Sequence, residues 1–287
     1  MRIIDIIKGN KPSLSFEVFP PKSFDSFEAV RLVTEAIAEL SPGYMSVTYG
    51  AGGSTDIYTP EIAACIANKG VTPLAHLSCI SADEEKVEGI LKRLRNIGVE
   101  NILALRGDLP SGMTVHNGVY KYASDLVAKI RDFGGFCIGG ACYPEGHPEA
   151  KNIDEDIENL KKKIDAGCEF LTTQMFFDNG IIYNYMDKLA SAGISVAVVP
   201  GIMPVTGTKQ IARIVSISGS ALPKRFMDII DKYSDDPIAM KLAGVEYATE
   251  QITDLYKNGF GAVHVYSMNK PDVAAAIQEK VSREVKI

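Results

Sequence analysis

The first β-rich run of the chain, LSFEVF, carries an acidic residue near its centre. Ser15, Glu17 and Phe19 alternate along this run and therefore share one face of a strand, which we expect to point inward. A carboxyl group in a poorly solvated cavity keeps its proton to higher pH, because desolvation disfavours the charged form. Such a group can act as a general acid near neutral pH. A structural glutamate paired with Arg106 or Lys22 is an equally open interpretation.

Charged residues also interrupt the ends of later apolar runs. Arg106, Gly107 and Asp108 place opposite charges around a glycine that allows close approach of a ligand to the backbone. A turn closed by a salt bridge would have the same pattern. His76, taken alone, is more typical of a hydrogen-bonded core histidine than of a ligand. His76, Glu17 and Asp108 could in principle bind a metal, but the strand ends lack the ligand cluster expected of a catalytic metal centre, so we expect no metal.

A polar stripe follows the fifth run. Asp156, Asn159 and Lys163 lie at i, i+3 and i+7 of a predicted helix, beside its apolar face. The stripe is either a solvated edge or a wall for the polar tail of a cofactor, with Lys163 near a phosphate or ribose. The preceding loop, YPEGHPE, mixes an aromatic residue, acids and a histidine, which is unusual for a simple connection.

Eight apolar runs alternate with helical patterns and would position these residues. The runs are Leu14–Phe19, Tyr44–Tyr49, Pro73–Cys79, Ile102–Gly107, Phe136–Tyr143, Phe170–Phe177, Val196–Ile202 and Gly261–Tyr266. The helical patterns are Asp25–Leu40, Asp83–Ile97, Tyr122–Phe133, Asp154–Ala166 and Ile181–Ala192, with extra helices near Lys209–Ile217, Pro223–Lys232 and Asp236–Asn258. Gly70, Gly98, Gly134, Gly167, Gly193 and Gly259 close helices before the next run.

This alternation predicts an α/β protein whose residues 1–287 form a single (β/α)8 TIM barrel, with extra helices between the seventh and eighth strands. A doubly wound open sheet usually has a glycine-rich turn after its first strand, whereas this chain has FPPK there. We expect the N-terminal residues 1–8 to form a short amphipathic helix over one end of the barrel. The active site would lie at the carboxyl ends of the strands.

The composition narrows the class of function. The chain has 287 residues, 46% of them hydrophobic and 23% charged, and its net charge of -6 has no basic stripe for nucleic acid. It contains no apolar run long enough to span a bilayer and no signal peptide pattern, so we expect a cytoplasmic protein. None of the five cysteines forms a C-x-x-C pair, which favours reduced thiols.

Several motifs in barrel order resemble the methylenetetrahydrofolate reductases, in particular their bacterial-type catalytic barrel. They are SFEVFPPKS, SVTYGAGGST, LAHLSC, NILALRGDLP, YPEGHPEA, DAGCEFLTTQMFFD, PGIMP and HVYSMN. The resemblance implies a non-covalent FAD and two hydride transfers. The first runs from NADH or NADPH to the flavin, and the second from the flavin to 5,10-methylenetetrahydrofolate, giving 5-methyltetrahydrofolate.

The same resemblance implies roles for individual residues. Glu17 would be the acid that assists ring opening, Asp108 the carboxylate close to flavin and pterin, and Gln174 the residue that meets pterin and nicotinamide. Gln210 and Lys270 would also contact substrate. The implied FAD shell consists of Thr48, Tyr49, Ala51, His76, Arg106, Gly107, Asp108, Ala123, Tyr143, His147, Ala150, Asp156, Asn159, Lys162 and Lys163.

Two departures from the family pattern bear on the substrates. Lys270 stands where the family often has an arginine for the folate tail, and lysine lacks the bidentate fork. The stretch VTGTKQIARI lacks an aromatic residue that some relatives stack against the dinucleotide. The electron donor therefore stays open between NAD(P)H and a partner protein that reduces a flavin- and folate-binding subunit. We also expect a homo-oligomer.

Overall fold

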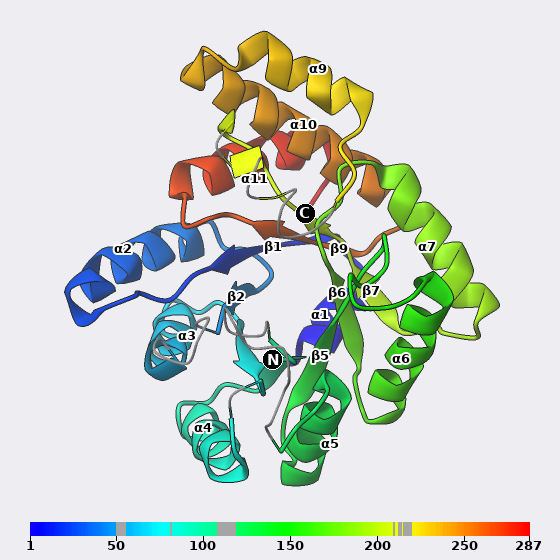
Figure 1. Ribbon diagram of the computed structural model, residues 1–287. Coiled ribbons are helices and arrows are strands. Elements are labelled where there is room, and N and C mark those ends of the chain that lie inside the picture. Colours follow the sequence, from blue (N-terminus) through cyan, green and yellow to red (C-terminus); the bar gives the residue numbers. More distant parts are fainter. Residues whose placement is uncertain (50–55, 81, 108–118, 209, 212–213, 215–219) are drawn as a thin grey trace.

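Parallel strands and helices alternate along the chain, and the strands wrap around a common axis (Figure 1). The computed structural model describes residues 1–49, 56–80, 82–107, 119–208, 210–211, 214 and 220–287. The strands are β1 (Ser13–Val18), β2 (Met45–Val47), β3 (Pro73–Ser78), β4 (Asn101–Leu105), β5 (Cys137–Cys142), β6 (Phe170–Thr173), β7 (Ala197–Val199), β8 (Gly201–Ile202) and β9 (Ala262–Tyr266). Within the described residues they form one parallel sheet in the order β7-β6-β5-β4-β3-β2-β1-β9-β8. The predicted α/β barrel is confirmed.

The seventh predicted strand is divided in two. Its halves, β7 and β8, lie on either side of Pro200, which has no N–H to give to a ladder. β7 pairs with β6, whereas β8 pairs with β9, so the two ends of the sheet meet at this proline. The Pro200 carbonyl accepts a hydrogen bond from His264 N at 2.9 Å, and Gly201 N donates to Thr173 Oγ1 at 2.8 Å. The expectation of one continuous seventh strand was therefore wrong.

The helices lie outside the strands and differ modestly from the predicted ranges. They are α1 (Ile3–Ile7), the 3-10 turn η1 (Phe24–Ser26), α2 (Phe27–Ala38), the 3-10 turn η2 (Asp56–Tyr58), α3 (Thr59–Asn68), α4 (Glu84–Asn96), α5 (Ala123–Phe133), α6 (Ile153–Asp165), α7 (Asn179–Ser191), α9 (Lys224–Tyr233), α10 (Pro237–Lys257) and α11 (Pro271–Glu284). The sequence patterns did not single out α3 and α11. The glycines predicted to close helices all have positive φ, between 75° and 124°.

The extra helices between the seventh and eighth strands are confirmed for α9 and α10. Phe226 of α9 packs against Phe177 and Tyr247, so a separate apolar cluster joins α9 and α10 to the segment after β6. α9 lies outside α10 as seen from the barrel (Figure 1). Most of the predicted helix at residues 209–217 lies outside the described residues. None of the helices in the described part of the chain has the length and apolarity needed to span a bilayer.

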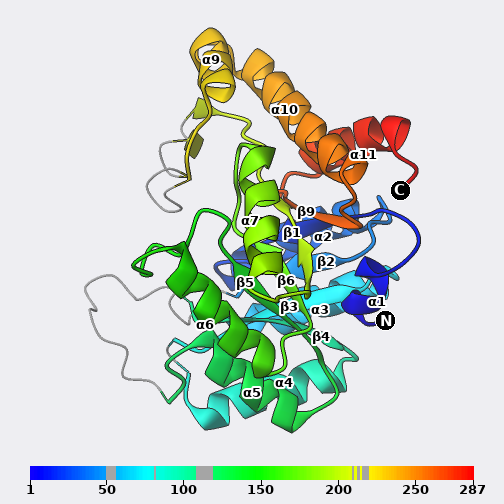
Figure 2. The same ribbon diagram turned by 90° about the vertical axis from the view of Figure 1, so that its right-hand side faces the viewer.

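The short N-terminal helix covers one end of the barrel, as expected. Ile3, Ile4 and Ile7 of α1 pack against inward-facing Leu103 and Phe170 and are at most 8% exposed. Figure 2 shows α1 at the end of the barrel where the strands begin. Because apolar side chains fill that end, an open cavity is left to the carboxyl ends of the strands.

Replacing Gly201 with alanine tests the junction of the seventh strand. An added Cβ would lie 2.4 Å from Tyr266 Oη and 2.5 Å from the Thr173 carbonyl oxygen, and that oxygen belongs to a paired strand. We expect Gly201→Ala to lower the free energy of unfolding by about 1–3 kcal/mol in urea denaturation. Gly89→Ala in α4 is the matched control, because nothing lies within 4 Å of its added Cβ. Equal midpoints for the two variants would contradict this account of the junction.

Candidate functional site

A cavity of about 940 Å³ opens at the carboxyl ends of the strands, where barrel enzymes place their active sites. Its walls come from β1, β3, β4, β5, β6 and β9 and from α5 and α6. The residues predicted to surround a cofactor that line it are Thr48, Tyr49, His76, Arg106, Gly107, Ala123, Tyr143, His147, Ala150, Asp156, Asn159, Lys162 and Lys163. Glu17 and Gln174 line it as well. Ala51 and Asp108 lie outside the described residues.

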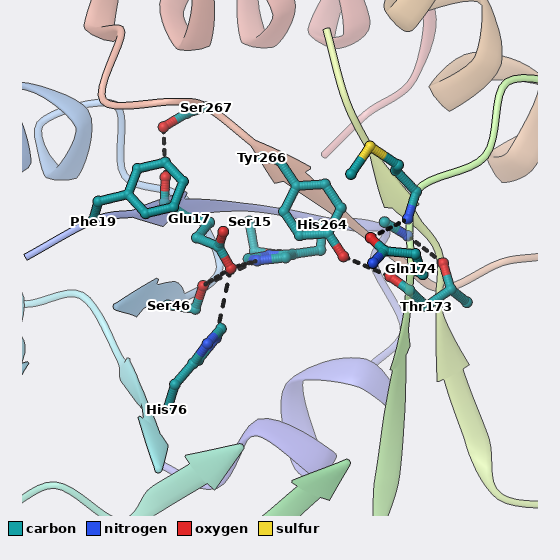
Figure 3. A network of polar contacts seen from close by, with 12 residues as sticks. Ser15, Glu17, Phe19, Ser46, His76, Thr173, Gln174, His264, Tyr266 and Ser267 are labelled. Atoms are coloured by element: carbon teal, nitrogen blue, oxygen red, sulfur yellow. Dashed lines mark hydrogen bonds and ion pairs between the residues drawn. The ribbon is translucent and has the colours of Figure 1, made fainter. Parts of the chain in front are cut away.

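Glu17 is held at the inner end of this cavity by strand register. It pairs with Ser46 of β2 on one side and with Tyr266 of β9 on the other, and it is 7% exposed. Its Oε2 accepts a hydrogen bond from Ser46 Oγ at 3.3 Å, and its backbone oxygen accepts one from Ser267 Oγ at 2.5 Å (Figure 3). Its inward orientation was predicted from the alternation of β1 and is confirmed.

Two histidines, and not Arg106 or Lys22, are the ionisable neighbours that the structure gives to the Glu17 carboxylate. His76 Nε2 lies 3.6 Å from Oε2, and His264 Nε2 lies 3.9 Å from it. Arg106 instead forms a two-point contact with Glu149, at 2.5 and 2.6 Å. The alternative of a Glu17–Arg106 ion pair is therefore wrong.

His264 is a site residue that the sequence interpretation missed. It is 2% exposed, its Nδ1 lies 2.8 Å from Ser15 Oγ, and its Nε2 lies 3.0 Å from Ser46 Oγ. The Tyr44 ring stacks on it, with centroids 5.6 Å apart and planes inclined by 6°. Ser46 was missed too. The sequence did contain a signal for His264. The alternation in AVHVY puts this histidine on the same face as Tyr266 within an apolar strand.

His76 differs from His264 in its hydrogen bonding. Its Nε2 is buried and has no hydrogen-bond partner among the described residues, although it borders the cavity. Burial lowers the pKa of His76 to about 4, outweighing the opposite effect of Glu17. The ring is therefore neutral near pH 7, and its Nε2 can still take a hydrogen-bond partner from a bound ligand.

The wall formed by α6 faces the cavity, and Asn159 within it is also exposed to solvent. Lys163 Nζ donates to the Ala141 carbonyl at 2.5 Å, and burial lowers the pKa of this lysine. Asp156 Oδ2 accepts from His147 N at 3.1 Å, and burial raises the pKa of Asp156. The His147 ring stands edge-on to Tyr143, with centroids 4.6 Å apart. The helix thus orders the YPEGHPEA loop and holds a cation at the cavity wall.

Gly107 closes the fourth strand in a conformation that favours glycine. Its φ is 89°, and an added Cβ would lie 2.1 Å from Ser78 Oγ. Ser78 Oγ donates to the Arg106 carbonyl at 2.8 Å, so the strand end is packed closely at this point. The predicted close approach of a ligand to the Gly107 backbone stays a prediction.

The opposite side of the cavity holds Gln174 and Tyr266. Gln174 Oε1 accepts from Met175 N at 3.0 Å, and Tyr266 Oη donates to the Thr173 carbonyl at 2.5 Å (Figure 3). Asn269 binds both backbone groups of Phe19, accepting from its N at 2.7 Å and donating to its O at 3.1 Å. The end of β1 is thereby tied to the loop after β9.

Gln210 and Lys270 do not line the cavity but lie together beyond it. Lys270 Nζ donates to Thr206 Oγ1 at 2.6 Å, and Thr206 N donates to Gln210 Oε1 at 3.2 Å. Lys270 is exposed. The structure thus brings the two residues together around Thr206.

The neutral state of His76 predicts how stability depends on pH. The unfolded ring binds a proton below its ordinary pKa of 6.5, whereas the folded ring does so only below about 4. The unfolded state therefore holds more protons between these values, and stability falls as the pH drops through this window. We expect a loss of roughly 3 kcal/mol from this residue. Urea denaturation of wild type and His76→Asn from pH 7 to 4 measures it, and parallel curves would contradict it.

Comparison with known proteins gives this site a family. A family model described as methylenetetrahydrofolate reductase matches residues 2–282. The chain is 35% identical over 266 residues to 5,10-methylenetetrahydrofolate reductase of Escherichia coli K12, covering 92% of this chain and 89% of that protein. It is 36% identical over 277 residues to methylenetetrahydrofolate reductase 1 of Schizosaccharomyces pombe, covering 94% of this chain and 46% of that protein.

A solved structure shares the fold. It is an uncharacterised protein from Clostridium thermocellum, described as binding two copies of 5-methyl-5,6,7,8-tetrahydrofolic acid. The two chains superpose with a TM-score of 0.67 at 15% identity, covering 99% of each. Because both the family model and these bacterial and yeast relatives span nearly the whole barrel, the chain belongs to the methylenetetrahydrofolate reductase family and is an oxidoreductase.

Proposed function

We propose that residues 1–287 act as one catalytic barrel that reduces 5,10-methylenetetrahydrofolate to 5-methyltetrahydrofolate, with Glu17 as general acid. The observation that carries this proposal is the buried Glu17 carboxyl group at the inner end of the cavity. It touches a hydroxyl group and two imidazole rings but no permanent cation among the described residues. A carboxyl group in such surroundings can donate a proton to a substrate nitrogen.

The cavity suits a large, partly charged cofactor, and we propose FAD. Its size is at the upper end of small-molecule sites, and its lining combines apolar strand ends with polar side chains. The buried His76 Nε2 and the Lys163 ammonium group would hold polar parts of the cofactor, with His147, Asp156 and Asn159 along the same wall. Bound FAD would supply the hydride that the folate receives. Asp108 and Ala51 join this proposal on the resemblance of their motifs alone.

Glu17 would act on the folate once the substrate fills the cavity. Its side chain is directed inward by β1, and its backbone is fixed by Ser267, so the carboxyl group has little freedom to move away. Protonation of the departing ring nitrogen would open the five-membered ring and leave a cationic carbon that can accept hydride. Phe19 and Tyr266 border the same space and would exclude water from it.

The opposite wall would position the rest of the folate. Gln174 lines the cavity and has an amide group suited to the pterin edge. Gln210 and Lys270 share Thr206 farther out, where Lys270 would meet the negatively charged tail. The Clostridium thermocellum protein, which shares this fold, is described as binding a tetrahydrofolate, and this supports a folate as substrate.

The hydride donor has two candidates. NADH or NADPH would enter the same cavity before the folate, meeting Gln174. The alternative is a flavin- and folate-binding subunit reduced by a partner protein, which the loss of an aromatic residue after Pro204 favours. Both candidates leave the role of Glu17 unchanged.

Replacing Glu17 separates the two half-reactions. We expect Glu17→Gln to leave reduction of the flavin by its donor within about threefold of wild type, because the acid acts only on the folate. Oxidation of the reduced flavin by 5,10-methylenetetrahydrofolate should fall by roughly 100-fold or more. Stopped-flow absorbance of each half-reaction measures both effects, with Glu279→Gln on the exposed face of α11 as control. Equal loss of both half-reactions would show a structural role.

The donor is tested by anaerobic mixing of the FAD-loaded protein with NADH or NADPH. We expect rapid bleaching of the flavin absorbance with at least one of them, because the cavity is large enough for a nicotinamide to reach the cofactor. Dithionite serves as the positive control. Bleaching by dithionite but by neither nucleotide would favour the partner-dependent subunit. A protein that cannot be reconstituted with FAD would overturn the proposed function.

A further inference from the structure

We propose that Ser46 and His264 form a proton relay for Glu17, in which His264 holds a proton inside the barrel and the Ser46 hydroxyl group passes it to the carboxylate. The proposal rests on the proposed role of Glu17 as general acid. It assigns a function to two residues that lie behind the acid and away from the mouth of the cavity. Both are positioning residues that act through Glu17.

Ser15 determines which nitrogen of His264 carries hydrogen. The Ser15 hydroxyl donates its single hydrogen to the Val263 carbonyl, at 3.1 Å. In the relay, Ser15 Oγ therefore accepts a hydrogen bond from His264 Nδ1, at 2.8 Å. The hydrogen of the neutral ring is then on Nδ1, and Nε2 is the nitrogen that exchanges a proton with Ser46. Nε2 is the atom that faces Ser46.

Ser46 bridges the two groups that can exchange a proton. Its Oγ lies 3.0 Å from His264 Nε2 and 3.3 Å from Glu17 Oε2 (Figure 3). With the proton on Glu17, the acid donates to Ser46 and Ser46 donates to Nε2. With the proton on His264, Nε2 donates to Ser46 and Ser46 donates to the carboxylate. Both arrangements satisfy every polar atom of the chain with the same heavy-atom positions.

The surroundings keep this chain rigid. Glu17 pairs with Ser46, and Ser15 pairs with His264, across neighbouring strands of one sheet. Ser15 and Ser46 are fully buried. Tyr44 stacks on the His264 ring, and Tyr266 meets it edge-on with centroids 5.6 Å apart. The ionisable groups that face His264 are therefore Glu17 from β1, His76 from β3 and these two tyrosines.

His76 is not an equivalent store of protons, although it lies closer to the carboxylate. Its Nε2 is 3.6 Å from Glu17 Oε2, and no described hydroxyl group bridges the two. Desolvation lowers the pKa of His76 to about 4, so the ring carries no proton to give near pH 7. The two histidines thus have different roles. Of the two, only His264 is linked to Glu17 through a hydroxyl group, that of Ser46, which can both donate and accept a hydrogen bond.

The transfer can be written as a balanced step. The step starts with the proton on His264 and with Glu17 as a carboxylate. The Nε2 proton moves to Ser46 Oγ while the Ser46 hydroxyl proton moves to Glu17 Oε2, so one N–H and one O–H bond break, two O–H bonds form, and His264 is left neutral. Glu17 then gives its proton to the departing folate nitrogen and becomes a carboxylate again. One proton from water restores His264 after the product leaves.

Ser46→Ala tests the bridge against a matched buried serine. Ser13→Ala is the control, because Ser13 Oγ is buried on the neighbouring strand and bonds to no described residue. We expect Ser46→Ala to slow folate-dependent flavin oxidation by roughly 10-fold or more, and the loss to grow as the pH rises from 6 to 9. Flavin reduction by the donor or by dithionite should stay within about threefold of wild type for both variants.

His264→Gln distinguishes a proton-carrying role of the His264 ring from a role in packing alone. Glutamine offers an amide group of similar reach but cannot gain and lose a proton at neutral pH. We expect it to show the same pH-dependent loss as Ser46→Ala, and the double variant to add nothing further. If His264→Gln keeps the wild-type pH profile, His264 only supports the packing and the relay is wrong.

A measurement without turnover tests the hydrogen positions. The chain has four histidines, so ¹⁵N-histidine NMR of the flavin-free protein gives a spectrum that can be assigned by substitution. We expect the hydrogen of neutral His264 on Nδ1, and an Nε2 resonance that moves in Ser46→Ala but not in Ser13→Ala. A hydrogen on Nε2 of the neutral ring would overturn the relay.

The two proposals fail in different ways. If wild type does not oxidise the flavin with methylenetetrahydrofolate, or if Glu17→Gln retains that step, the proposed function fails. If Glu17→Gln loses the step but Ser46→Ala matches wild type at every pH, Glu17 remains the acid and the relay alone is wrong.

Discussion

The register of β1 between β2 and β9 is the constraint on which the rest of the site depends. It places Glu17 beside Ser46 and Ser15 beside His264, so the polar groups inside the barrel meet one another and not apolar side chains. A shift of one residue would turn Glu17 outward, towards the apolar layer under the helices. The free energy of burying a carboxyl group is thus offset by neighbours on two other strands.

Two features stabilise that register, one at an end of the barrel and one where the two ends of the sheet meet. At one end, α1 fills the space between the strands with isoleucine side chains, which leaves the polar layer nearer the other end. At the join of the sheet, Pro200 divides the seventh strand, and its carbonyl accepts the backbone N–H of His264. The histidine that faces Glu17 is therefore anchored at the point where the sheet closes on itself.

The inner end and the outer wall of the site are built differently. Its inner end consists of strand residues whose polar atoms bond to one another, whereas its outer wall consists of the YPEGHPEA loop and α6. Lys163 and Asp156 are both partly buried along that wall, and this burial disfavours the charged form of each. A bound cofactor with a polar tail would add partners to the ones that these groups already have, the Ala141 carbonyl and the His147 N–H. It would also supply a partner for the buried Nε2 of His76.

Much of this arrangement could be predicted before any coordinates. Alternation within LSFEVF and the recurrence of strand, helix and glycine come from short-range rules, so the barrel, the inward Glu17 and the polar stripe of α6 followed from the sequence. The motifs also identified the family. These features depend on residues close in the chain, for which spacing is a direct guide to geometry.

The partners of Glu17 were decided by the tertiary structure alone. Arg106 looked like a suitable ion-pair partner, but Glu149 binds it, 43 residues farther along the chain. His264 lies 247 positions after Glu17, yet the sheet brings β9 directly beside β1 (Figure 1). No local pattern encodes such a neighbour, because strand order is set by closure of the barrel. The sequence by itself determined which acid points inward, and only the folded sheet decided which groups can share its proton.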